Sequence, residues 1–147
     1  MGSIRPRASD YGPASMGQPE TTPSGFAEEI GIEWVNLDPD DAQARIAVES
    51  RHLQPAGIVH GGVFASLAES LTSAATYGAV REEGMVAIGQ ANDTTFLRPI
   101  ADGYINASAK PRHRGQTTWV WDVEISDDEG RACALARVTI AVRPRRD

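Results

Sequence analysis

Cysteine and long apolar runs are scarce in this sequence. Cys133 is the only cysteine, so no disulfide can form within the chain, and a reducing cytoplasm is the expected setting. No apolar run approaches the ~20 residues that a membrane-spanning helix needs. The first residues also lack the apolar centre of a secretory signal. We therefore expect no membrane association.

Motifs for metals, nucleotides and serine nucleophiles are missing as well. The three histidines, His52, His60 and His113, do not stand at metal-ligand spacing, and a single cysteine offers no zinc site. There is no glycine-rich nucleotide fingerprint and no Gly-x-Ser-x-Gly nucleophile elbow. The sequence predicts neither a bound metal nor a separate cofactor.

Basic residues are outnumbered, and only one of them is a lysine. The formal net charge is −6 and the pI is near 5.0, which argues against nucleic-acid binding, because phosphate contacts need a basic face. Lys110 is the lone lysine and the other cations are arginines, which pair well with phosphate oxygens. An anionic ligand would therefore need a local cluster of cations.

The two ends of the chain differ from its centre. Residues 1–24 are rich in Pro, Gly, Ser and Thr without a hydrophobic period, which predicts a flexible arm. Residues 143–147 are predicted to form a polar tail. Residues 25–142 carry regular hydrophobic patterns and are enough for one domain with its own core.

Within this domain the patterns predict an α+β fold with one long helix and five or six strands. The helix is expected at residues 61–79, and a short one at 26–30. Strands are expected where apolar and polar residues alternate: at 30–34, 42–49, 85–97, 104–111, 118–125 and 132–142.

The predicted long helix has two faces of different character. At about 100° per residue, one stripe is apolar and suits packing on a sheet: Phe64, Leu67, Leu71, Ala74, Ala75 and Gly78. The opposite stripe is small and polar: Gly62, Ala65, Ser66, Glu69, Thr72, Ser73 and Thr76. Solvated helix faces usually carry long charged side chains, so we expect both faces to be covered, the second by another subunit.

A compact set of polar residues surrounds the start of this helix. Gln54 and His60-Gly61-Gly62 precede it, while Glu69 and Ser73 follow on the small polar stripe. Unpaired N–H groups at a helix start can stabilise a developing oxyanion. A carboxylate among small residues can act as a general base or a nucleophile. Singly these residues have ordinary structural explanations; together they predict an active site.

The pattern Gln54-Pro-x-Gly-x-x-His60-Gly-Gly, followed by Leu67-Ala-Glu69-Ser, resembles the hotdog-fold acyl-CoA thioesterases of the phenylacetyl-CoA and hydroxybenzoyl-CoA type. Relatives with the most similar pattern act on aryl-CoA and dihydroxynaphthoyl-CoA thioesters. The similarity extends from about Gly25 to Val142. It implies a long central helix wrapped by a five- or six-stranded antiparallel sheet, and hydrolysis of aryl- or medium-chain acyl-CoA to free acid and CoA.

The resemblance also implies a role for each polar residue. Glu69 would activate water or attack the thioester carbon, and the Gly61 N–H would hold the carbonyl oxygen. Gln54 and His60 would orient the thioester, and Ser73 would help to position the water. The site would lie between subunits, with Glu69 of one chain facing Gln54 and His60 of the other. The expected assembly is a homodimer, further paired into a homotetramer.

Coenzyme A itself carries a diphosphate and a 3′-phosphate, so an acidic protein needs local cations to bind it. The resemblance implies contacts to its nucleotide and pantetheine from Gly89, Phe96, Arg98, Lys110, Arg112, His113, Arg114, Gly115, Gln116 and Thr117. An ordinary solvated hairpin is the other interpretation of residues 110–118. Phe64 and Tyr77 are candidates for an acyl pocket and equally for the core.

The sequence is also compatible with two other functions. One is a hotdog enoyl-CoA hydratase or dehydratase, although Gln54 and Ser73 suit hydrolysis better. The other is a non-catalytic acyl-CoA-binding sensor, against which the intact Glu69 counts. An acyl-carrier-protein thioester is an alternative substrate, and the sequence identifies neither the acyl group nor the choice between the two roles of Glu69.

Overall fold

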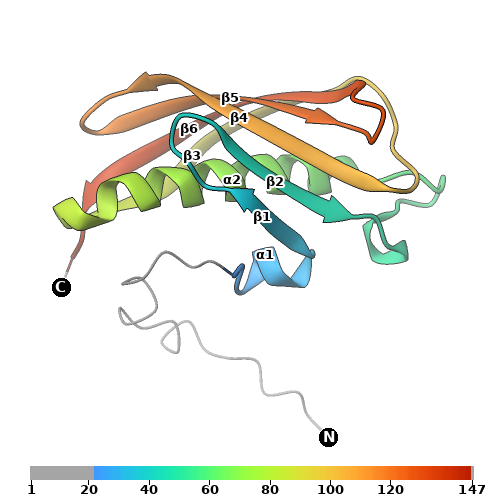
Figure 1. The fold of residues 1–147 in the computed structure, drawn as a ribbon, viewed down its shortest axis with the longest axis horizontal. Coiled ribbons are helices and arrows are strands. Elements are labelled where there is room, and N and C mark those ends of the chain that lie inside the picture. The colour runs from blue at the N-terminus through green and yellow to red at the C-terminus, as the bar shows by residue number, and fades with distance from the viewer. Residues whose placement is uncertain (1–21, 147) are drawn as a thin grey trace, which may run out of the picture.

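The computed structural model of the protein describes residues 22–146, so nearly all of the predicted N-terminal arm lies outside the described residues. One long helix, α2 (Gly61–Val80), runs along the concave face of a curled sheet (Figure 1). The helices and strands in chain order are α1 (Phe26–Glu29), β1 (Ile32–Asn36), β2 (Ala42–Ala47), a 3-10 turn (Ser50–His52), α2, a second 3-10 turn (Arg81–Glu83), β3 (Met85–Phe96), β4 (Tyr104–Arg114), β5 (Thr118–Ser126) and β6 (Ala132–Pro144).

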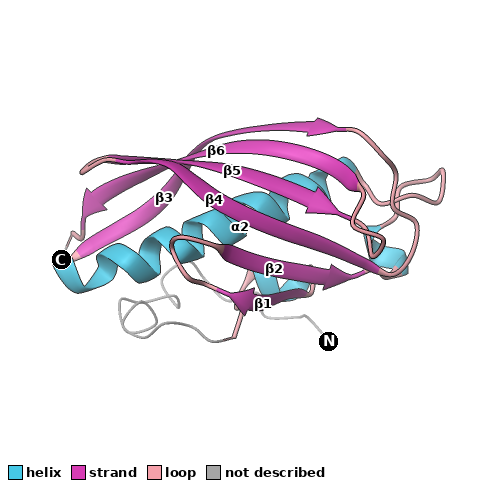
Figure 2. Ribbon diagram, turned by 45° about the horizontal axis from the view of Figure 1, so that its top comes forward, coloured by secondary structure: helices cyan, strands magenta, loops and turns pink. Residues whose placement is uncertain are grey.

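The six strands form a single antiparallel sheet in the order β1-β2-β4-β5-β6-β3. Figure 2 shows the sheet curving around α2, as the sequence predicts. α2 connects β2, next to one edge of the sheet, with β3 at the opposite edge. The helix therefore crosses the concave face of the sheet, and β3 then pairs with β6. Among the described residues no helix is long and apolar enough to cross a membrane.

The core lies between α2 and the concave face of the sheet. Leu67, Ala68, Leu71 and Ala75 are completely buried, together with large side chains of the sheet such as Trp121. Burial of this apolar stripe stabilises the packing of the helix on the sheet. The gain in free energy is about 25 cal/mol per Å² of apolar surface removed from water. The alternation along β5 and β6 is therefore confirmed as a one-sided pattern that faces the helix.

Thr72 and Thr76 depart from the predicted helix faces. Both were expected on the small polar stripe, yet both are completely buried. Each hydroxyl donates to the carbonyl one turn earlier, Thr72 to Ala68 and Thr76 to Thr72. The Trp121 indole N–H in turn donates to the Thr76 hydroxyl at 2.9 Å. Satisfied hydroxyls can enter an apolar core, so the buried stripe is wider than predicted, while Gly78 is exposed.

The other side of α2 is covered by little of the described chain. Gly62 and Glu69 are exposed, and the rest of this strip, Ala65, Ser66 and Ser73, is half-buried. We call these five residues the open face of α2. Small side chains leave the helix backbone accessible along this face, so another polypeptide can approach it closely.

The last strands are longer than the sequence predicts. β6 was expected to end at residue 142, but Arg143 and Pro144 continue it because Val86 and Met85 of β3 lie opposite them. β4 was expected to end at residue 111 and instead reaches Arg114. The β6 extension pairs with a distant strand, which local composition does not reveal. The β4 extension pairs with β5, the next strand along the chain, with Arg114 opposite Trp119.

Candidate active site

His60 caps the start of α2 with its imidazole ring. Its Nδ1 accepts a hydrogen bond from the Gly62 N–H at 2.8 Å, and its backbone carbonyl accepts from the Val63 N–H at 2.9 Å. With Nδ1 occupied as an acceptor, the neutral ring carries its proton on Nε2. The exposed His60 side chain therefore presents an N–H donor to a ligand at the helix start.

Gly61 is the first residue of α2, and its N–H has no acceptor within the helix. Among the described residues no hydrogen bond involves this N–H. A Cβ at Gly61 would lie only 2.7 Å from Cζ of Phe96, so the aromatic ring rests directly on the glycine. The Gly61 amide is thus a free donor beside the Phe96 ring, which is 55% exposed.

Phe64 lies behind this ring and belongs to the core. It is 3% exposed, and its ring centroid is 6.1 Å from that of Phe96. Of the two interpretations of Phe64, the structure favours the core one, with Phe96 as the more exposed member of the pair. Tyr77 is half-buried near the other end of α2.

Glu69 lies on the open face of α2, with its carboxylate packed against β3. A Cβ at Gly89 would approach Cδ of Glu69 to 2.9 Å and Oε1 to 3.1 Å. Only a glycine leaves room for the carboxylate in this position. The structure thus places Gly89, expected among the coenzyme A contacts, beneath the predicted catalytic carboxylate.

A β-bulge places several β3 residues toward α2. Gly89 pairs with Ile140 and Ala91 with Thr139, so Gln90 is an extra residue opposite β6. After such a bulge, the side chains change faces relative to the regular alternation. Asn92 consequently joins Gly89 on the side that faces the helix.

Asn92 is a site residue that the sequence reasoning missed. Its side-chain amide donates to the Ala65 carbonyl of α2 at 2.9 Å, and its Oδ1 accepts from the Thr94 hydroxyl at 2.7 Å. The one available signal is composition, because asparagine is depleted in strands and its presence within one asks for a side-chain partner.

Three contacts with β3 therefore follow successive turns of α2 in antiparallel order. Phe96 rests on Gly61, Asn92 binds the carbonyl of Ala65, and Gly89 supports Glu69. The helix positions are four residues apart, which keeps them near one side of the helix. β3 therefore forms one continuous floor beside the predicted catalytic residues.

Gln54 lies in a tight loop before α2 and is bound to that loop. Its side-chain oxygen accepts from the Ala56 N–H, and its backbone N–H donates to the Ile58 carbonyl at 2.8 Å. Gly57 provides the left-handed backbone conformation, φ 80°, that closes the loop. Within the described residues no hydrogen bond connects Gln54 or His60 to Glu69, and Ser73 lies half-buried one turn beyond it.

The buried His52 anchors this loop to the fold. Its Nδ1 accepts from the Glu49 N–H at 2.9 Å, and its Nε2 lies 2.8 Å from the Ile30 carbonyl. Its own carbonyl accepts from the His60 N–H at 2.8 Å. A satisfied core histidine therefore fixes the backbone that presents His60.

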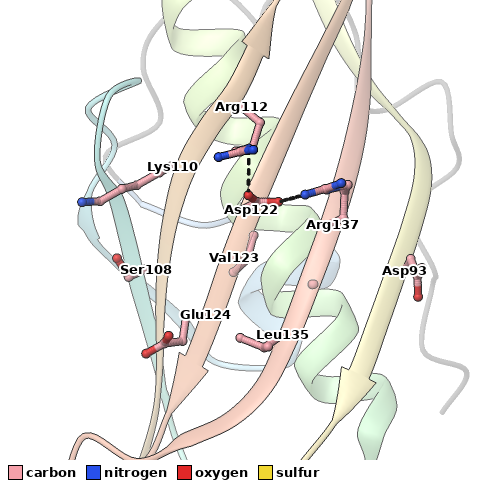
Figure 3. Close-up of a pocket in the computed structure, with 10 residues that line it drawn as sticks. Asp93, Ser108, Lys110, Arg112, Asp122, Val123, Glu124, Leu135 and Arg137 are labelled. Atoms are coloured by element: carbon pink, nitrogen blue, oxygen red, sulfur yellow. Dashed lines mark hydrogen bonds and ion pairs between the residues drawn. The ribbon is translucent and has the colours of Figure 1, made fainter.

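The predicted cations of the β4–β5 region do not gather in one place. Lys110 and Arg112 line a groove on the outer face of the sheet, where Asp122 pairs with Arg112 at 3.2 Å and with Arg137 at 2.9 Å (Figure 3). In Figure 3, α2 lies behind the strands that carry these residues, so the groove and the open face are on opposite sides of the sheet.

Arg114 takes a different direction from Lys110 and Arg112. Its guanidinium binds the Pro39 carbonyl and the Asp40 carboxylate in the β1–β2 turn, and it lies 5.0 Å from the Trp119 ring centroid. The β4 bulge after Pro111 separates it from the outer groove. His113, Gln116 and Thr117 at the turn are exposed and Gly115 is half-buried, while Arg98 is exposed in the loop after β3.

Metal-ligating side chains are dispersed in the structure. In the part of the chain from residue 22 to 146, no group of three or more His, Cys, Asp or Glu residues could hold a metal ion. The Gly61 amide and the His60 ring lie together at the start of α2, and the Glu69 carboxylate lies two turns further along the same helix. Donors and a carboxylate of this kind can polarise and attack a carbonyl when they meet at one substrate.

Comparisons with known proteins agree with this chemistry. A family model described as the thioesterase superfamily matches residues 56–134. The proofreading thioesterase EntH of Cronobacter turicensis is 34% identical over 122 residues, which cover 83% of this chain and 88% of that protein. The crystal structure of a mutant thioesterase from Pseudomonas aeruginosa is similar with a TM-score of 0.79 and 35% identity, covering 83% of this chain and 88% of that one.

A thioesterase structure from Haemophilus influenzae is similar as well, with a TM-score of 0.75 and 32% identity over 82% of this chain and 84% of its own. The family match spans more than half of the described residues and includes the helix that carries Glu69. The fold that the sequence predicts is thereby confirmed. The chain belongs to the thioesterase superfamily and is a thioester hydrolase with the hotdog fold.

Proposed function

We propose that this protein hydrolyses acyl-CoA thioesters to a free acid and CoA, with Glu69 as the catalytic carboxylate. The observation that carries the proposal is the position of Glu69, whose carboxylate rests on Gly89 at the open face of α2. The acyl group is proposed to be aryl or medium-chain, as in the phenylacetyl-CoA and hydroxybenzoyl-CoA enzymes whose motif this sequence resembles. The exposed Phe96 ring beside Gly61 supports an aromatic group there.

In the proposed reaction, the Gly61 N–H binds the thioester carbonyl oxygen and stabilises its negative charge as the tetrahedral intermediate forms. Glu69 takes a proton from a water molecule that attacks the carbonyl carbon. The C–S bond then breaks, and the thiolate of CoA leaves and receives the proton. Alternatively, Glu69 attacks the carbon itself, and water cleaves the resulting anhydride. Ser73, one turn beyond Glu69, would help to position that water.

The active site is proposed to be shared between two copies of the chain. Gly61 and Glu69 are eight residues apart in α2, so their backbones are about 12 Å apart along the helix axis. That span is long for one thioester group. A second copy would supply Gln54, His60 and the Gly61 amide to Glu69 of the first.

The free edge of β3 supports this assembly. β3 is twelve residues long and ends the sheet, so its outer backbone groups have no strand partner among the described residues. Long unpaired edges in soluble proteins are usually covered, and pairing with a second β3 would bring two open faces together. The dimer would pair again into a tetramer. The proposed contacts for coenzyme A remain residues 110–118 together with Arg98.

The test follows release of free thiol from a panel of aryl and fatty acyl-CoA thioesters, with an acyl-carrier-protein thioester included. Glu69→Gln should lower kcat by about 10²- to 10⁴-fold, the usual contribution of a positioned base. Glu82→Gln, an equal charge change in the turn after α2, is the matched control and should retain wild-type turnover.

Each competing function predicts a different result in the same assays. An inactive wild-type chain that still binds CoA thioesters would indicate a sensor, and hydration of crotonyl-CoA would indicate a hydratase. If Glu69→Gln kept more than a tenth of wild-type turnover, the assigned mechanism would be wrong.

The shared site can be tested by complementation. Glu69→Gln and His60→Ala chains, each inactive as a homodimer, are coexpressed with different tags. A mixed dimer has one site with both native residues, so random pairing restores about a quarter of the sites. Mixed dimers without activity, or a fully active monomer in sedimentation experiments, would contradict a shared site.

A further inference from the structure

Asn92 is half-buried between β3 and α2, and its bond to the helix is unusual in kind. A helix carbonyl in mid-helix normally accepts one backbone N–H four residues later. The Ala65 carbonyl lies inside α2 and has this helical partner. It also accepts a hydrogen bond from the side-chain amide of Asn92 at 2.9 Å. This carbonyl therefore receives two donors, one from its own helix and one from β3.

The helical partner of the Ala65 carbonyl is the backbone N–H of Glu69. In an α-helix the N–H of residue i binds the carbonyl of residue i−4, and Ala65 and Glu69 both lie inside α2. Asn92 consequently donates to the same carbonyl oxygen that accepts the backbone N–H of Glu69, the proposed catalytic residue. The connection from β3 to Glu69 is only two hydrogen bonds long.

The Ala65 carbonyl only accepts, so it requires the NH₂ end of the Asn92 amide to face the helix, and Thr94 holds the other end. The Thr94 hydroxyl donates to Oδ1 of Asn92 at 2.7 Å. With Oδ1 engaged as an acceptor, the NH₂ group is the end that reaches Ala65. A rotated amide would set its oxygen against the Ala65 carbonyl and lose that bond, although the Thr94 hydroxyl could still accept from the rotated NH₂ group.

Gly89 restricts Glu69 from the other end of the side chain. The carboxylate rests on Gly89, while the backbone is held through Ala65 by Asn92. Both residues reach the helix because the extra residue Gln90 changes the facing of the side chains that follow. Backbone and carboxylate are thus fixed by one strand segment.

We infer that Asn92 is a positioning residue for the catalytic step: by holding the Ala65 carbonyl, it sets the placement of Glu69 relative to the reacting thioester. This inference rests on the proposed function, in which Glu69 attacks or activates water. Asn92 does not touch the substrate. Its effect belongs in kcat, because displacing a catalytic group by about 1 Å can cost on the order of 100-fold in rate.

The experiment measures kcat, KM and thermal stability of the full chain for Asn92→Ala, Asn92→Asp and Thr94→Val. Asn92→Ala removes the donor, and Asn92→Asp replaces it with an oxygen that repels the Ala65 carbonyl. Both should lower kcat by about 10- to 100-fold with KM changed by less than about threefold. Thr94→Val keeps the donor but frees its orientation, so its loss of kcat should be smaller.

Thr95→Ala is the matched control, since Thr95 is the exposed neighbour of Thr94 on the same strand. It should behave as wild type. A second control repeats Asn92→Ala in the Glu69→Gln background. If Asn92 acts through Glu69, the double variant should lose less than about twofold relative to Glu69→Gln alone.

The outcomes separate the inference from the proposed function. An unchanged kcat in both Asn92 variants, while Glu69→Gln abolishes turnover, overturns the positioning role alone. A full further loss of rate in the Glu69→Gln background, or a fall in stability that accounts for the lost rate, shows a purely structural bond and also overturns it. An inactive wild-type chain, or an active Glu69→Gln, overturns the proposed function, and this inference falls with it.

Discussion

The two faces of α2 differ in what their residues contact, although they share one helix. The buried face meets the concave side of the sheet, and its residues Leu67, Leu71 and Thr76 are completely buried. The open face lies beside β3, and its residues are exposed or half-buried in the described part of the chain, with Glu69 among the exposed ones. This difference indicates that one face supplies the stability of the fold, and the other can be given to chemistry.

The largest effect on stability is expected from Leu71→Ala on the buried face. Removing a completely buried leucine side chain should lower the free energy of unfolding by about 2–5 kcal/mol. Urea denaturation measures the loss, and kcat per folded molecule should stay near the wild-type value. If kcat instead fell while stability held, the division between the two faces would be wrong.

Gly89→Ala tests the floor beneath the open face. The added Cβ would stand 2.9 Å from Cδ of Glu69, so the carboxylate must move. We expect kcat to fall by about 10- to 100-fold, with little change in melting temperature. Stopped assays and calorimetry on the same sample measure both quantities. Wild-type turnover in this variant would show that the position of the Glu69 carboxylate over Gly89 is not required.

Thr76→Val tests the polar pair inside the buried face. It removes the acceptor of the Trp121 indole N–H and leaves a buried donor without a partner, which costs about 1–3 kcal/mol. Thr72→Val is the matched control, because the Thr72 hydroxyl binds only helix carbonyls. Urea unfolding should show the greater loss for Thr76→Val. Equal losses would mean that the indole bond contributes nothing measurable.

The smallest effect is expected from Gly78→Ala near the end of α2. Apart from the backbone of its own helix, a Cβ at Gly78 would meet no atom of residues 22–146 within 4 Å. Replacing glycine by alanine inside an exposed helix stabilises it by up to about 1 kcal/mol. A small rise in melting temperature with unchanged kcat is the expected result, and it serves as the glycine-to-alanine control for Gly89. Destabilisation would indicate that another surface packs against Gly78.

Sequence patterns predicted α2 and the strands β2, β4, β5 and β6 well because each has one buried side and one more open side. The helix at 61–79 and its motif residues were placed within one residue of α2. Thr72 and Thr76 were misassigned because hydroxyl groups read as polar, while their hydrogen bonds to the helix and Trp121 make them suitable for the core.

The supporting residues of the site could not be predicted in the same way. Asn92 depends on a bulge, and a bulge depends on register with β6, fifty residues further along the chain. Arg114 reads as a free cation in a basic turn, but its partner Asp40 is 74 residues away. Such pairings follow from the closed fold rather than from local spacing.

The extra residue in β3 changes which positions of this strand face the helix. Up to Gly89 the odd-numbered positions face the helix, and beyond Gln90 the even-numbered ones do. Deleting Gln90 would remove the bulge and leave each residue from Ala91 onward opposite its present β6 partner, so Asn92 would still face the helix. If Gln90 instead paired regularly with β6, Asp93 would face the helix in place of Asn92. The bulge therefore lets this sequence turn an uncharged amide, and not its acidic neighbour, toward the helix that carries Glu69.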